Sequence, residues 1–347
     1  MHPSTMKQWV VESKEHDFDG LVYKDAAVPK VGENEVLVKL HAASLNYRDL
    51  IIPKGLYPFA LSLPVVPGSD GAGEVVEVGS KVIEFKKGDQ VATLFNQGHQ
   101  YGEIDSHAAG TGLGGVIDGT LREYGVFNEQ GLVKAPRNLD AREASTLPCA
   151  ALTSWNALYG LKPLKPGQIV LVQGTGGVSM FGLQFAKAAG ATVIATTSSD
   201  EKAEKLKKLG ADHVINYKTE PNWGEVARKL TPDGAGVDHV LEVGGSGTLQ
   251  QSFKCIKFEG IISVIGFLGG VDSKTQPTVL ETLNHICTVR GVYVGSKALM
   301  RDMIRAIEAN DIHPVVDEKV FTLEQTREAY SYMLAQKHFG KLTIKIN

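Results

Sequence analysis

Hydrophobic and polar residues follow one pattern up to about residue 150 and another after it. In the first part, short apolar runs such as Val36–Leu40 and Gly73–Val78 are separated by glycine and proline turns, which indicates a mostly β region. In the second part, short apolar strands alternate with amphipathic helices. Such alternation predicts an α/β fold with a doubly wound parallel sheet.

The second part begins with a buried-type strand at Ile169–Gln173 and a helix over Val178–Ala189, in which Phe181, Phe185 and Ala188 share one face. The same pattern predicts strands at Thr192–Thr196, Val214–Tyr217, Val237–Val243, Gly260–Phe267 and Thr288–Val294, and helices at Asp200–Leu209, Trp223–Leu230 and Thr248–Lys257. Two more helices and a final strand at Leu342–Ile346 follow, so the C-terminal segment is expected to rejoin the first region.

Composition narrows the classes of function. Of the 347 residues, 43% are hydrophobic and 22% are charged, and the formal net charge is −3, so no overall field favours nucleic acid or a membrane surface. The longest apolar stretch, roughly 260–271, is too short to cross a bilayer. The three cysteines form no CxxC pair; they exclude a four-cysteine zinc site within the chain and fit a cytoplasmic protein.

A glycine turn after the first strand of the second part indicates a dinucleotide site. Gly174 allows a sharp bend, and Gly176 lets the backbone approach a pyrophosphate that the following helix N-terminus attracts. Ser179 replaces the third glycine of the usual fingerprint and is small enough to keep helix and strand close. A tight turn without a ligand is the alternative. The expected cofactor contacts are Gly174, Thr175, Gly176, Gly177, Val178 and Ser179.

The end of the next strand bears on which nicotinamide dinucleotide binds. NAD sites commonly carry Asp or Glu there to hold the ribose hydroxyls, whereas this chain has Thr197. The hydroxyls of Ser198 and Ser199 and the ammonium of Lys202 suit a 2′-phosphate, so NADP(H) is the expected cofactor. The serines can equally cap the following helix, and the two roles are compatible.

A second glycine-rich segment, Gly110–Gly115, is expected to have a different role. It follows no predicted strand and opens no predicted helix. We therefore expect a flexible loop there, such as a lid, and no phosphate cradle.

Four segments resemble the medium-chain dehydrogenases/reductases. Pro67–Gly79, Phe85–Val91 and Asp118–Tyr124 resemble the N-terminal domain of that superfamily, and Leu147–Leu158 resembles its interdomain helix. The resemblance runs in order over essentially the whole chain.

This resemblance implies two domains with a cleft between them. A GroES-like, mostly β catalytic domain is expected over residues 1–150 and 291–347, and a Rossmann domain that binds NADP(H) over 151–290. In such enzymes hydride moves between the nicotinamide and a carbonyl, an alcohol or an activated alkene.

The resemblance also implies that the catalytic zinc of the superfamily's alcohol dehydrogenases is missing. Their Cys, His and Cys ligands match Asn46, Ser69 and Cys149, and one thiolate cannot hold the metal. A loop cluster of His99, Asp105 and His107 is better explained as exposed polar side chains than as a metal site. We therefore expect no metal. Without zinc ligands, the sequence resembles the quinone oxidoreductase-like branch of the superfamily.

Without a metal, a protein donor has to stabilise the negative charge that develops on the substrate. Tyr57 matches a tyrosine that looks catalytic in related enoyl-thioester reductases, Asn46 replaces a ligand beside the nicotinamide, and Tyr47 is a candidate for the cleft wall. Arg48 and Asp49 are more simply a structural ion pair, and Cys149 a small buried residue.

Other cofactor contacts are expected at strand ends, where open α/β sheets bind ligands. Simple turn chemistry is the alternative for each of their glycines. These candidates, from strand ends and from resembling segments, are Thr153, Tyr217, Val243, Gly244, Gly245, Ile265, Gly266, Phe267, Val294, Gly295, Phe339 and Lys341.

Three functions remain open from the sequence. The first is NADPH-dependent reduction of an electrophilic C=C bond or a quinone; the second is metal-free carbonyl reduction or alcohol oxidation; the third is non-catalytic NADP(H) binding. Each involves a small-molecule ligand and neither nucleic acid nor a membrane. The strand at Thr288–Val294 resembles one that pairs across a dimer in this superfamily, so a homodimer is expected.

Overall fold

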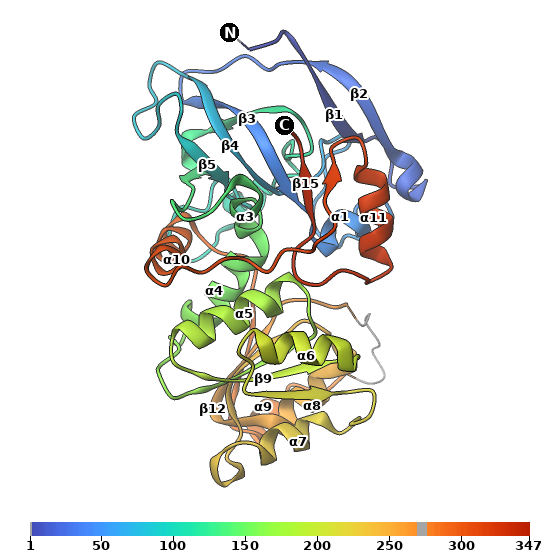
Figure 1. The fold of residues 1–347 in the computed structure, drawn as a ribbon, viewed down its shortest axis with the longest axis vertical. Coiled ribbons are helices and arrows are strands. Elements are labelled where there is room, and N and C mark those ends of the chain that lie inside the picture. Colours follow the sequence, from blue (N-terminus) through green and yellow to red (C-terminus); the bar gives the residue numbers. More distant parts are fainter. Residues whose placement is uncertain (1, 269–275) are drawn as a thin grey trace. The chain divides into compact units, whose positions relative to one another are not determined.

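The computed structural model describes residues 2–268 and 276–347, which form two compact units (Figure 1). Unit 1 comprises Met1–Leu152 and Val294–Asn347, and unit 2 comprises Thr153–Tyr293. The chain therefore leaves unit 1, builds unit 2, and returns to unit 1.

Unit 2 contains a parallel sheet with strand order β10-β9-β8-β11-β12-β13. The residues of β8 are all buried, as expected for a strand covered on both faces. The strands of this sheet are β8 (Ile169–Gln173), β9 (Thr192–Thr197), β10 (His213–Asn216), β11 (Val237–Glu242), β12 (Ile256–Val264) and β13 (Thr288–Gly291). The helical segments are α4 (Leu152–Tyr159, which begins at the junction), α5 (Gly177–Ala188), α6 (Asp200–Lys208), α7 (Trp223–Lys229), η4 (Pro232–Gly234), α8 (Ser246–Cys255) and α9 (Glu281–Asn284).

Unit 1 is mostly β. Its larger sheet has the order β14-β15-β3-β4-β5-β7, with β6 also paired to β3, and β1 pairs separately with β2. The strands are β1 (Thr5–Val11), β2 (Leu21–Ala27), β3 (Glu35–Ser44), β4 (Asp70–Val78), β5 (Gln90–Thr93), β6 (Tyr124–Asn128), β7 (Leu132–Lys134), β14 (Phe321–Thr322) and β15 (Thr343–Lys345). The helical segments are η1 (Asp17–Gly20), α1 (Tyr47–Ile51), α2 (Ser106–Ala109), η2 (Glu129–Gly131), α3 (Ala141–Ala144), η3 (Leu147–Ala151), α10 (Lys297–Ala309) and α11 (Thr326–Leu334).

The expected fold class, a Rossmann parallel sheet with a GroES-like β domain, is confirmed. The C-terminal strand does return to unit 1, where β15 pairs antiparallel with β3 and places Thr343 opposite Ser44. Several predicted boundaries were wrong. The helix predicted to run to Lys257 ends at Cys255, and β12 begins at Ile256, four residues before the predicted start of that strand, and ends at Val264 instead of Phe267. β13 ends at Gly291 instead of Val294.

The glycine-rich segment Gly110–Gly115 is packed, contrary to the expectation of a flexible loop. Leu113, Gly114 and Gly115 are buried, and Gly114 has a positive φ of 69°. A Cβ atom at Gly114 would lie 2.7 Å from backbone atoms of Gly68. The glycines therefore serve close packing of backbone on backbone, which a sequence pattern does not distinguish from flexibility.

In the part of the chain that the structure describes, no helix is long and apolar enough to cross a membrane.

His239, in the centre of unit 2, predicts an acid-sensitive fold. It lies on β11 with 1% of its surface exposed, and within the described structure neither ring nitrogen has a hydrogen-bond partner. Burial lowers the pKa of His239 to about 4. Its imidazole is therefore neutral in the folded protein, whereas the unfolded chain takes up a proton at about pH 6.5.

Stability from this residue is complete above pH 6.5 and is lost as the pH falls toward 4, because the unfolded state then binds more protons. We expect His239 to make the protein about 2 kcal/mol less stable at pH 5 than at pH 7.5. Urea unfolding of the parent and of His239→Leu at both pH values measures this contribution. An equal pH dependence in the two proteins would contradict it.

Candidate functional site

The turn between β8 and α5 leaves room for a ligand. Gly174 has a φ of 72°, and its amide donates to the Thr196 carbonyl at 2.9 Å. A Cβ atom at Gly174 or at Gly176 would have no described atom within 4 Å. Gly176 is also the N-cap of α5, so the free amides of the first helical turn border this open space. The turn therefore fits a dinucleotide pyrophosphate.

Ser179 does not have the expected packing role alone. It is buried, and its hydroxyl donates to the Gln173 carbonyl at 2.5 Å, tying the helix back to the end of β8. The close approach of α5 to the sheet occurs at Gly182, where a Cβ atom would lie 2.4 Å from Leu241 Cδ2. Gly182, three residues after Ser179, therefore provides the close helix–sheet packing that the third glycine of the fingerprint usually provides.

The end of β9 carries an unsatisfied hydroxyl. Thr197 is 1% exposed, and among the described residues its Oγ1 has no hydrogen-bond partner, which is costly in a site closed to water. Ser198 is exposed, and Ser199 caps α6 by accepting from the Lys202 amide at 3.3 Å. The capping role is therefore present, and the Ser199 hydroxyl proton is still available to a ligand. The amide of Tyr217 donates to the Thr197 carbonyl at 2.9 Å, so these residues lie together.

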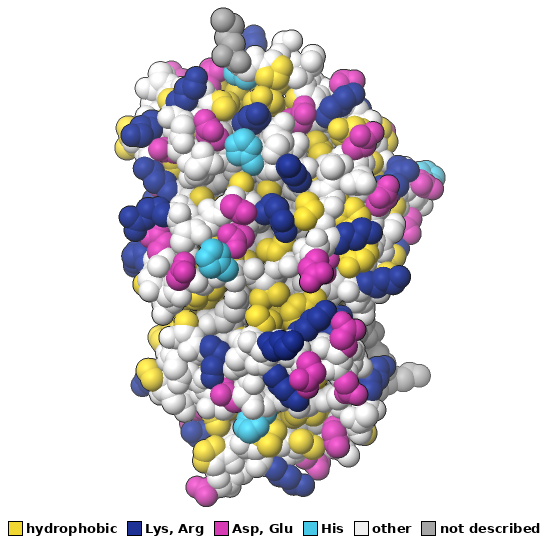
Figure 2. All heavy atoms as spheres, in the orientation of Figure 1, with side chains coloured by type: hydrophobic (Ala, Val, Ile, Leu, Met, Phe, Trp, Pro, Cys, Tyr) yellow, Lys and Arg dark blue, Asp and Glu magenta, His cyan; other side chains and the backbone are white. Residues whose placement is uncertain are grey.

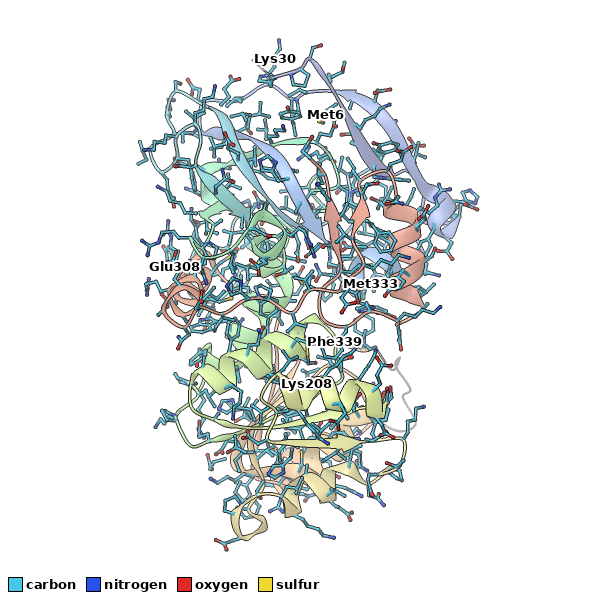
Figure 3. The ribbon with its side chains drawn as sticks, viewed as in Figure 1. Met6, Lys30, Lys208, Glu308, Met333 and Phe339 are labelled. Carbon is cyan, nitrogen blue, oxygen red and sulfur yellow. The ribbon has the colours of Figure 1, made fainter. Side chains whose placement is uncertain are left out.

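Lysines gather on α6 beside this edge. Lys205, Lys207 and Lys208 are exposed, and Lys202 is half-buried. Figure 2 shows basic side chains over α6, where Lys208 is labelled in Figure 3. Glu201 and Glu204 pair with Lys205 and Lys207. Their positive charge is therefore partly balanced on the helix itself.

A buried carboxylate organises the next strand end. Glu242, the last residue of β11, is fully buried and accepts from Gln173 Nε2 at 2.7 Å and from the Gly244 and Gly245 amides at 2.9 and 3.0 Å. The hydroxyls of Thr248 and Ser252 also donate to it. A carboxylate, which only accepts, matches these five donors.

The same network reaches the other predicted contacts of unit 2. Gln173 Oε1 accepts from the Val243 amide at 3.1 Å, and the Glu242 carbonyl accepts from Ile265 at 2.8 Å and Gly266 at 3.3 Å. Val178, in the first turn of α5, has its carbonyl bonded by Ser154 at 2.6 Å, next to buried Thr153. Phe267 follows Gly266 and is half-buried. The structure therefore gathers these residues around the carboxyl ends of β8, β11 and β12.

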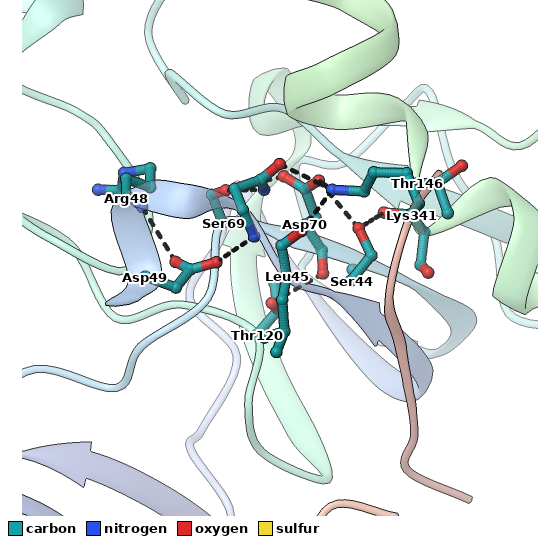
Figure 4. Close-up of polar contacts among 12 residues, drawn as sticks. Ser44, Leu45, Arg48, Asp49, Ser69, Asp70, Thr120, Thr146 and Lys341 are labelled. Carbon is teal, nitrogen blue, oxygen red and sulfur yellow. Dashed lines mark hydrogen bonds and ion pairs between the residues drawn. The ribbon is translucent and has the colours of Figure 1, made fainter. Parts of the chain in front are cut away.

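Unit 1 contains a polar cluster around Asp70 (Figure 4). Asp70 opens β4 and is fully buried; its Oδ2 accepts from Ser44 at 3.0 Å, and its Oδ1 accepts from Ser69 at 2.8 Å. The Lys341 ammonium lies 3.3 Å from Oδ2 of Asp70 and 2.7 Å from Oδ1 of Asn46. Asn46 Nδ2 in turn lies 3.4 Å from the Ser69 hydroxyl. A buried ion pair thus stands beside Asn46 and Ser69.

Tyr57 lies against a buried arginine. Arg48 Nε donates to the Tyr57 hydroxyl at 3.3 Å, and the guanidinium carbon is 5.0 Å from the Tyr57 ring centre and 4.7 Å from that of Phe95. Arg48 Nη1 donates to the Leu113 carbonyl at 2.8 Å, and a Cβ atom at Gly115 would lie 2.7 Å from Nη2. The packed glycine segment therefore makes space for this guanidinium.

The expected ion pair between Arg48 and Asp49 is present but long, at 3.7 Å. Burial raises the pKa of Asp49 to about 6, although Arg48 opposes this shift. Asp49 Oδ2 accepts a hydrogen bond from the backbone N–H of Asn46 at 2.8 Å, which closes the first turn of α1. Asp49 therefore holds the backbone of Asn46, while Arg48 is turned toward Tyr57.

The remaining predicted residues of unit 1 have mixed surroundings. Tyr47 is half-buried against the core around Leu45 and Leu50. Val294 has a φ of 52°, an uncommon conformation for a β-branched residue, and a Cβ atom at the buried Gly295 would lie 2.9 Å from the Leu152 side chain. Phe339, labelled in Figure 3, donates its amide to Asp317 at 2.8 Å. Of the unit 1 residues predicted to contact the cofactor, Lys341 alone is joined to the Asp70 cluster by a described contact.

The donors at the zinc-ligand positions do not fit zinc. Burial, with the nearby charge of Asp70, raises the pKa of Cys149 to about 12, so its thiol stays protonated; the residue is half-buried, not fully buried as expected. Asn46 and Ser69 supply an amide and a hydroxyl beside the Lys341 ammonium. Within residues 2–268 and 276–347, no group of three or more His, Cys, Asp or Glu side chains could hold a metal.

The loop histidines need one correction. Asp105 and His107 are exposed as expected, but His99 is 6% exposed and its Nε2 lies 3.1 Å from the Gly102 carbonyl. His99 therefore packs within its own loop.

Sequence reasoning missed Gln173 and Glu242 and gave Asp70 no role. A polar residue at the last position of a predicted buried strand was the available signal: Gln173 ends the otherwise apolar β8, and Glu242 follows Val240 and Leu241 at the end of β11. Such residues lie at the ligand-binding edge of a parallel sheet and must be satisfied there.

Two family models match the chain. A model of the alcohol dehydrogenase GroES-like domain matches residues 32–137, and a model of zinc-binding dehydrogenases matches residues 177–309. The first model lies within unit 1. The second model lies within unit 2 up to residue 293, and its last residues, 294–309, belong to unit 1.

Whole proteins are also similar over nearly the full chain. A zinc-type alcohol dehydrogenase-like protein of Schizosaccharomyces pombe is 51% identical over 345 residues, covering 98% of this chain and 99% of that protein. A 2-methylene-furan-3-one reductase of Solanum lycopersicum is 32% identical over 349 residues, covering 99% of this chain and 79% of that protein. A crystal structure of an NAD-dependent alcohol dehydrogenase matches with a TM-score of 0.88 at 33% identity, over 99% of this chain and 100% of the other.

Fold, cofactor turn and relatives agree with one another. The Rossmann unit provides the glycine turn and strand ends of a nicotinamide dinucleotide site, and the GroES-like unit provides the polar cluster. On this evidence the chain belongs to the medium-chain dehydrogenase/reductase superfamily and is an oxidoreductase that uses a nicotinamide cofactor.

Proposed function

We propose that the protein reduces an electrophilic C=C bond or a quinone with NADPH and without a metal. The observation that carries this proposal is the pair of donors in unit 1: the Tyr57 phenol beside Arg48, and the Asn46 amide beside Lys341. Both are of the kind that stabilises an oxygen anion, and Asn46 is at a position that matches a zinc ligand of the alcohol dehydrogenases, where the metal would act as a Lewis acid. The similarity to a 2-methylene-furan-3-one reductase supports a conjugated alkene as substrate.

The chemistry asks little of the protein beyond charge stabilisation and one proton. NADPH, held at the turn of Gly174 and Gly176, would supply a hydride to the β-carbon of an enone, and this addition would leave an enolate. Asn46 then donates a hydrogen bond to the enolate oxygen. Tyr57 either donates its one proton in a hydrogen bond to the same oxygen or transfers it to the α-carbon, in which case water reprotonates the phenolate. For a quinone the reduced anion is already stable, so proton delivery matters less.

Carbonyl reduction is the second candidate, because the same two donors would stabilise an alkoxide and because relatives are named alcohol dehydrogenases. The two reactions give different products from one enone: a saturated ketone or an allylic alcohol. NADPH oxidation with cyclohex-2-enone, menadione, crotonyl-CoA and hexanal, followed by mass spectrometry of the products, separates them. Turnover of hexanal alone would reject the first candidate, and tight NADPH binding without any turnover would reject both.

NADPH is proposed over NADH because Thr197 replaces the usual carboxylate and because Ser198, Ser199 and Lys202 stand nearby. Hydrogen bonds to a charged phosphate contribute about 1.5–3 kcal/mol each, so we expect a preference of about tenfold or more. Thr197→Asp should reverse it, since a carboxylate repels the 2′-phosphate and binds ribose hydroxyls.

The preference is measured as the ratio of dissociation constants from nicotinamide fluorescence. Lys202→Ala should weaken NADPH binding and leave NADH binding nearly unchanged. Thr192→Asp, at the opposite end of β9, is the matched control and should leave the ratio unaltered. Equal affinities of the parent for both cofactors would refute the proposed preference.

A homodimer is proposed from the edge of unit 2. β13 stands at one end of the sheet order, and apolar residues next to it are exposed: Leu280 by 63%, Leu283 by 73% and Ile286 by 49%. An exposed strand edge beside apolar side chains favours pairing with a second copy. Sedimentation equilibrium at a mass of one chain would exclude it.

A further inference from the structure

The ammonium group of Lys341 is fully occupied inside unit 1. Its Nζ lies 2.7 Å from the Leu45 carbonyl, 2.7 Å from Asn46 Oδ1 and 3.3 Å from Asp70 Oδ2, and the residue is 3% exposed. An ammonium donates three hydrogen bonds and accepts none. The oxygen of the Asn46 side chain, and not its nitrogen, therefore has to face Lys341.

Ser69 fixes the other end of the same amide. The single hydroxyl proton of Ser69 goes to Asp70 Oδ1 at 2.8 Å, so the Ser69 oxygen is left to accept. Asn46 Nδ2 lies 3.4 Å from that oxygen. Turning the amide over would set nitrogen against the ammonium and oxygen against oxygen, and both contacts would be lost. Asp70 and Lys341 thus specify one orientation.

One N–H bond of Asn46 remains for another partner. Asn46 is half-buried, whereas Lys341, Asp70 and Ser69 are fully buried behind it, so Asn46 is the member of the cluster that reaches its edge. An outward N–H group attracts an oxygen anion, and an outward carbonyl would repel it. The direction of the amide therefore decides whether the site can stabilise negative charge.

We propose that Lys341 is a positioning residue that, together with Asp70, holds the Asn46 amide with its N–H group outward as a donor to the substrate oxygen. The inference rests on the proposed function, which assigns Asn46 to that oxygen. It differs from the cofactor contact that the family resemblance implies for Lys341. In this arrangement a buried ammonium acts through an amide and never touches the reacting atoms.

The donor itself is tested with Asn46→Asp. The new carboxylate has the same shape and still accepts from Lys341, but it presents an anionic oxygen where the N–H group was. With cyclohex-2-enone as the probe, kcat is expected to fall by about 10²–10³-fold, the loss typical of one oxyanion donor. NADPH affinity and the urea midpoint should stay near the parent values. A parental kcat would overturn the inference.

The positioning role is tested with Lys341→Met and with the double variant Lys341→Met/Asp70→Asn. The single variant leaves a buried carboxylate unpaired and is expected to lose stability; the double variant removes both charges and should regain it. If Lys341 positions Asn46, kcat stays about 10–100-fold low in the stable double variant, while NADPH affinity is unchanged. Lys345→Met, an exposed lysine on β15, is the matched control and should leave activity unaltered.

Two results would overturn the role of Lys341. A parental kcat in the double variant would make the ion pair purely structural. A tenfold weaker NADPH affinity in Lys341→Met, with kcat unchanged at saturation, would make Lys341 a cofactor ligand instead.

An NMR measurement keeps the inference testable even if the parent reduces none of the probes, in which case the proposed function alone fails. With ¹⁵N-asparagine, the side-chain signals of Asn46 are identified by their loss in Asn46→Asp. The parent should show one pair of N–H signals, and the double variant should show a shifted or second pair as the amide turns. Identical signals in both proteins would overturn the inference.

Discussion

Tyr57→Phe is expected to lower kcat for cyclohex-2-enone by about 10²–10⁴-fold, the usual contribution of a positioned general acid. Arg48 Nε donates to the Tyr57 hydroxyl at 3.3 Å, so that oxygen already accepts and its own proton is directed elsewhere. The nearby guanidinium also stabilises the negative charge left behind when the proton moves. Steady-state kinetics with saturating NADPH measures the loss, and the dissociation constant of NADPH should not change.

The quinone gives an internal comparison for the same variant. Reduction of menadione should slow much less, because its reduced anion needs no proton at carbon. Tyr101→Phe is the matched control, since Tyr101 is 78% exposed and has no described contact with Arg48 or with the Asp70 cluster. If Tyr57→Phe reduced every good substrate at parental rates, Tyr57 would only line the site, and Tyr47 or water would be the better proton donor.

Glu242→Leu is expected to destabilise the protein by about 3–5 kcal/mol, because five buried donors lose their acceptor at about 1–3 kcal/mol each, partly offset by the removal of a buried carboxylate. The carboxylate accepts from the side chains of Gln173, Thr248 and Ser252 and from the amides of Gly244 and Gly245. Leucine fills similar space but leaves those donors without an acceptor. Because the two glycine amides lie at the ligand edge of the sheet, NADPH affinity should fall as well.

Urea unfolding at pH 7.5 measures the stability term, and Glu242→Gln grades it. Glutamine keeps an oxygen for Gly244, Gly245 and Thr248 but opposes one N–H group to Gln173, so a loss of about 1–3 kcal/mol is expected. Glu225→Leu, which breaks an exposed pair with Lys254, should change little. A Glu242→Leu protein as stable as the parent would show that the network carries no net stabilisation.

The sequence was sufficient for the cofactor turn because its determinants are local. A buried strand, two glycines and an amphipathic helix follow one another between Ile169 and Ala188, and the structure places them as β8, turn and α5. The Ser199 cap was also recognisable from its place before a charged helix. What local pattern did not reveal was the purpose of Gly110–Gly115, whose neighbours Gly68 and Arg48 lie far away in the chain.

The polar cluster of unit 1 could not be assembled from sequence for the same reason. Lys341 and Asp70 are 271 positions apart, and periodicity carries no information about such a pair. Lys341 was recognised only by its resemblance to a family segment, which pointed to the cofactor and not to Asn46. Glu242 was missed for another reason. Its strand was predicted, but the sequence does not reveal that five donors converge on its carboxylate in the folded protein.

The return of the chain to unit 1 has a consequence for synthesis on the ribosome. Unit 2 is continuous and can fold as soon as residues 153–293 have emerged. In unit 1, Asp70 meets Lys341 only after 271 further residues have been translated, and β3 pairs with β15 only when Thr343–Lys345 have been made. Through that interval a partly built unit 1 has Asp70 without its cation, and Ala42–Ser44 of β3 without their partner strand β15. Nascent chains therefore contain all of unit 2 before the Asp70 cluster of unit 1 can be completed by Lys341.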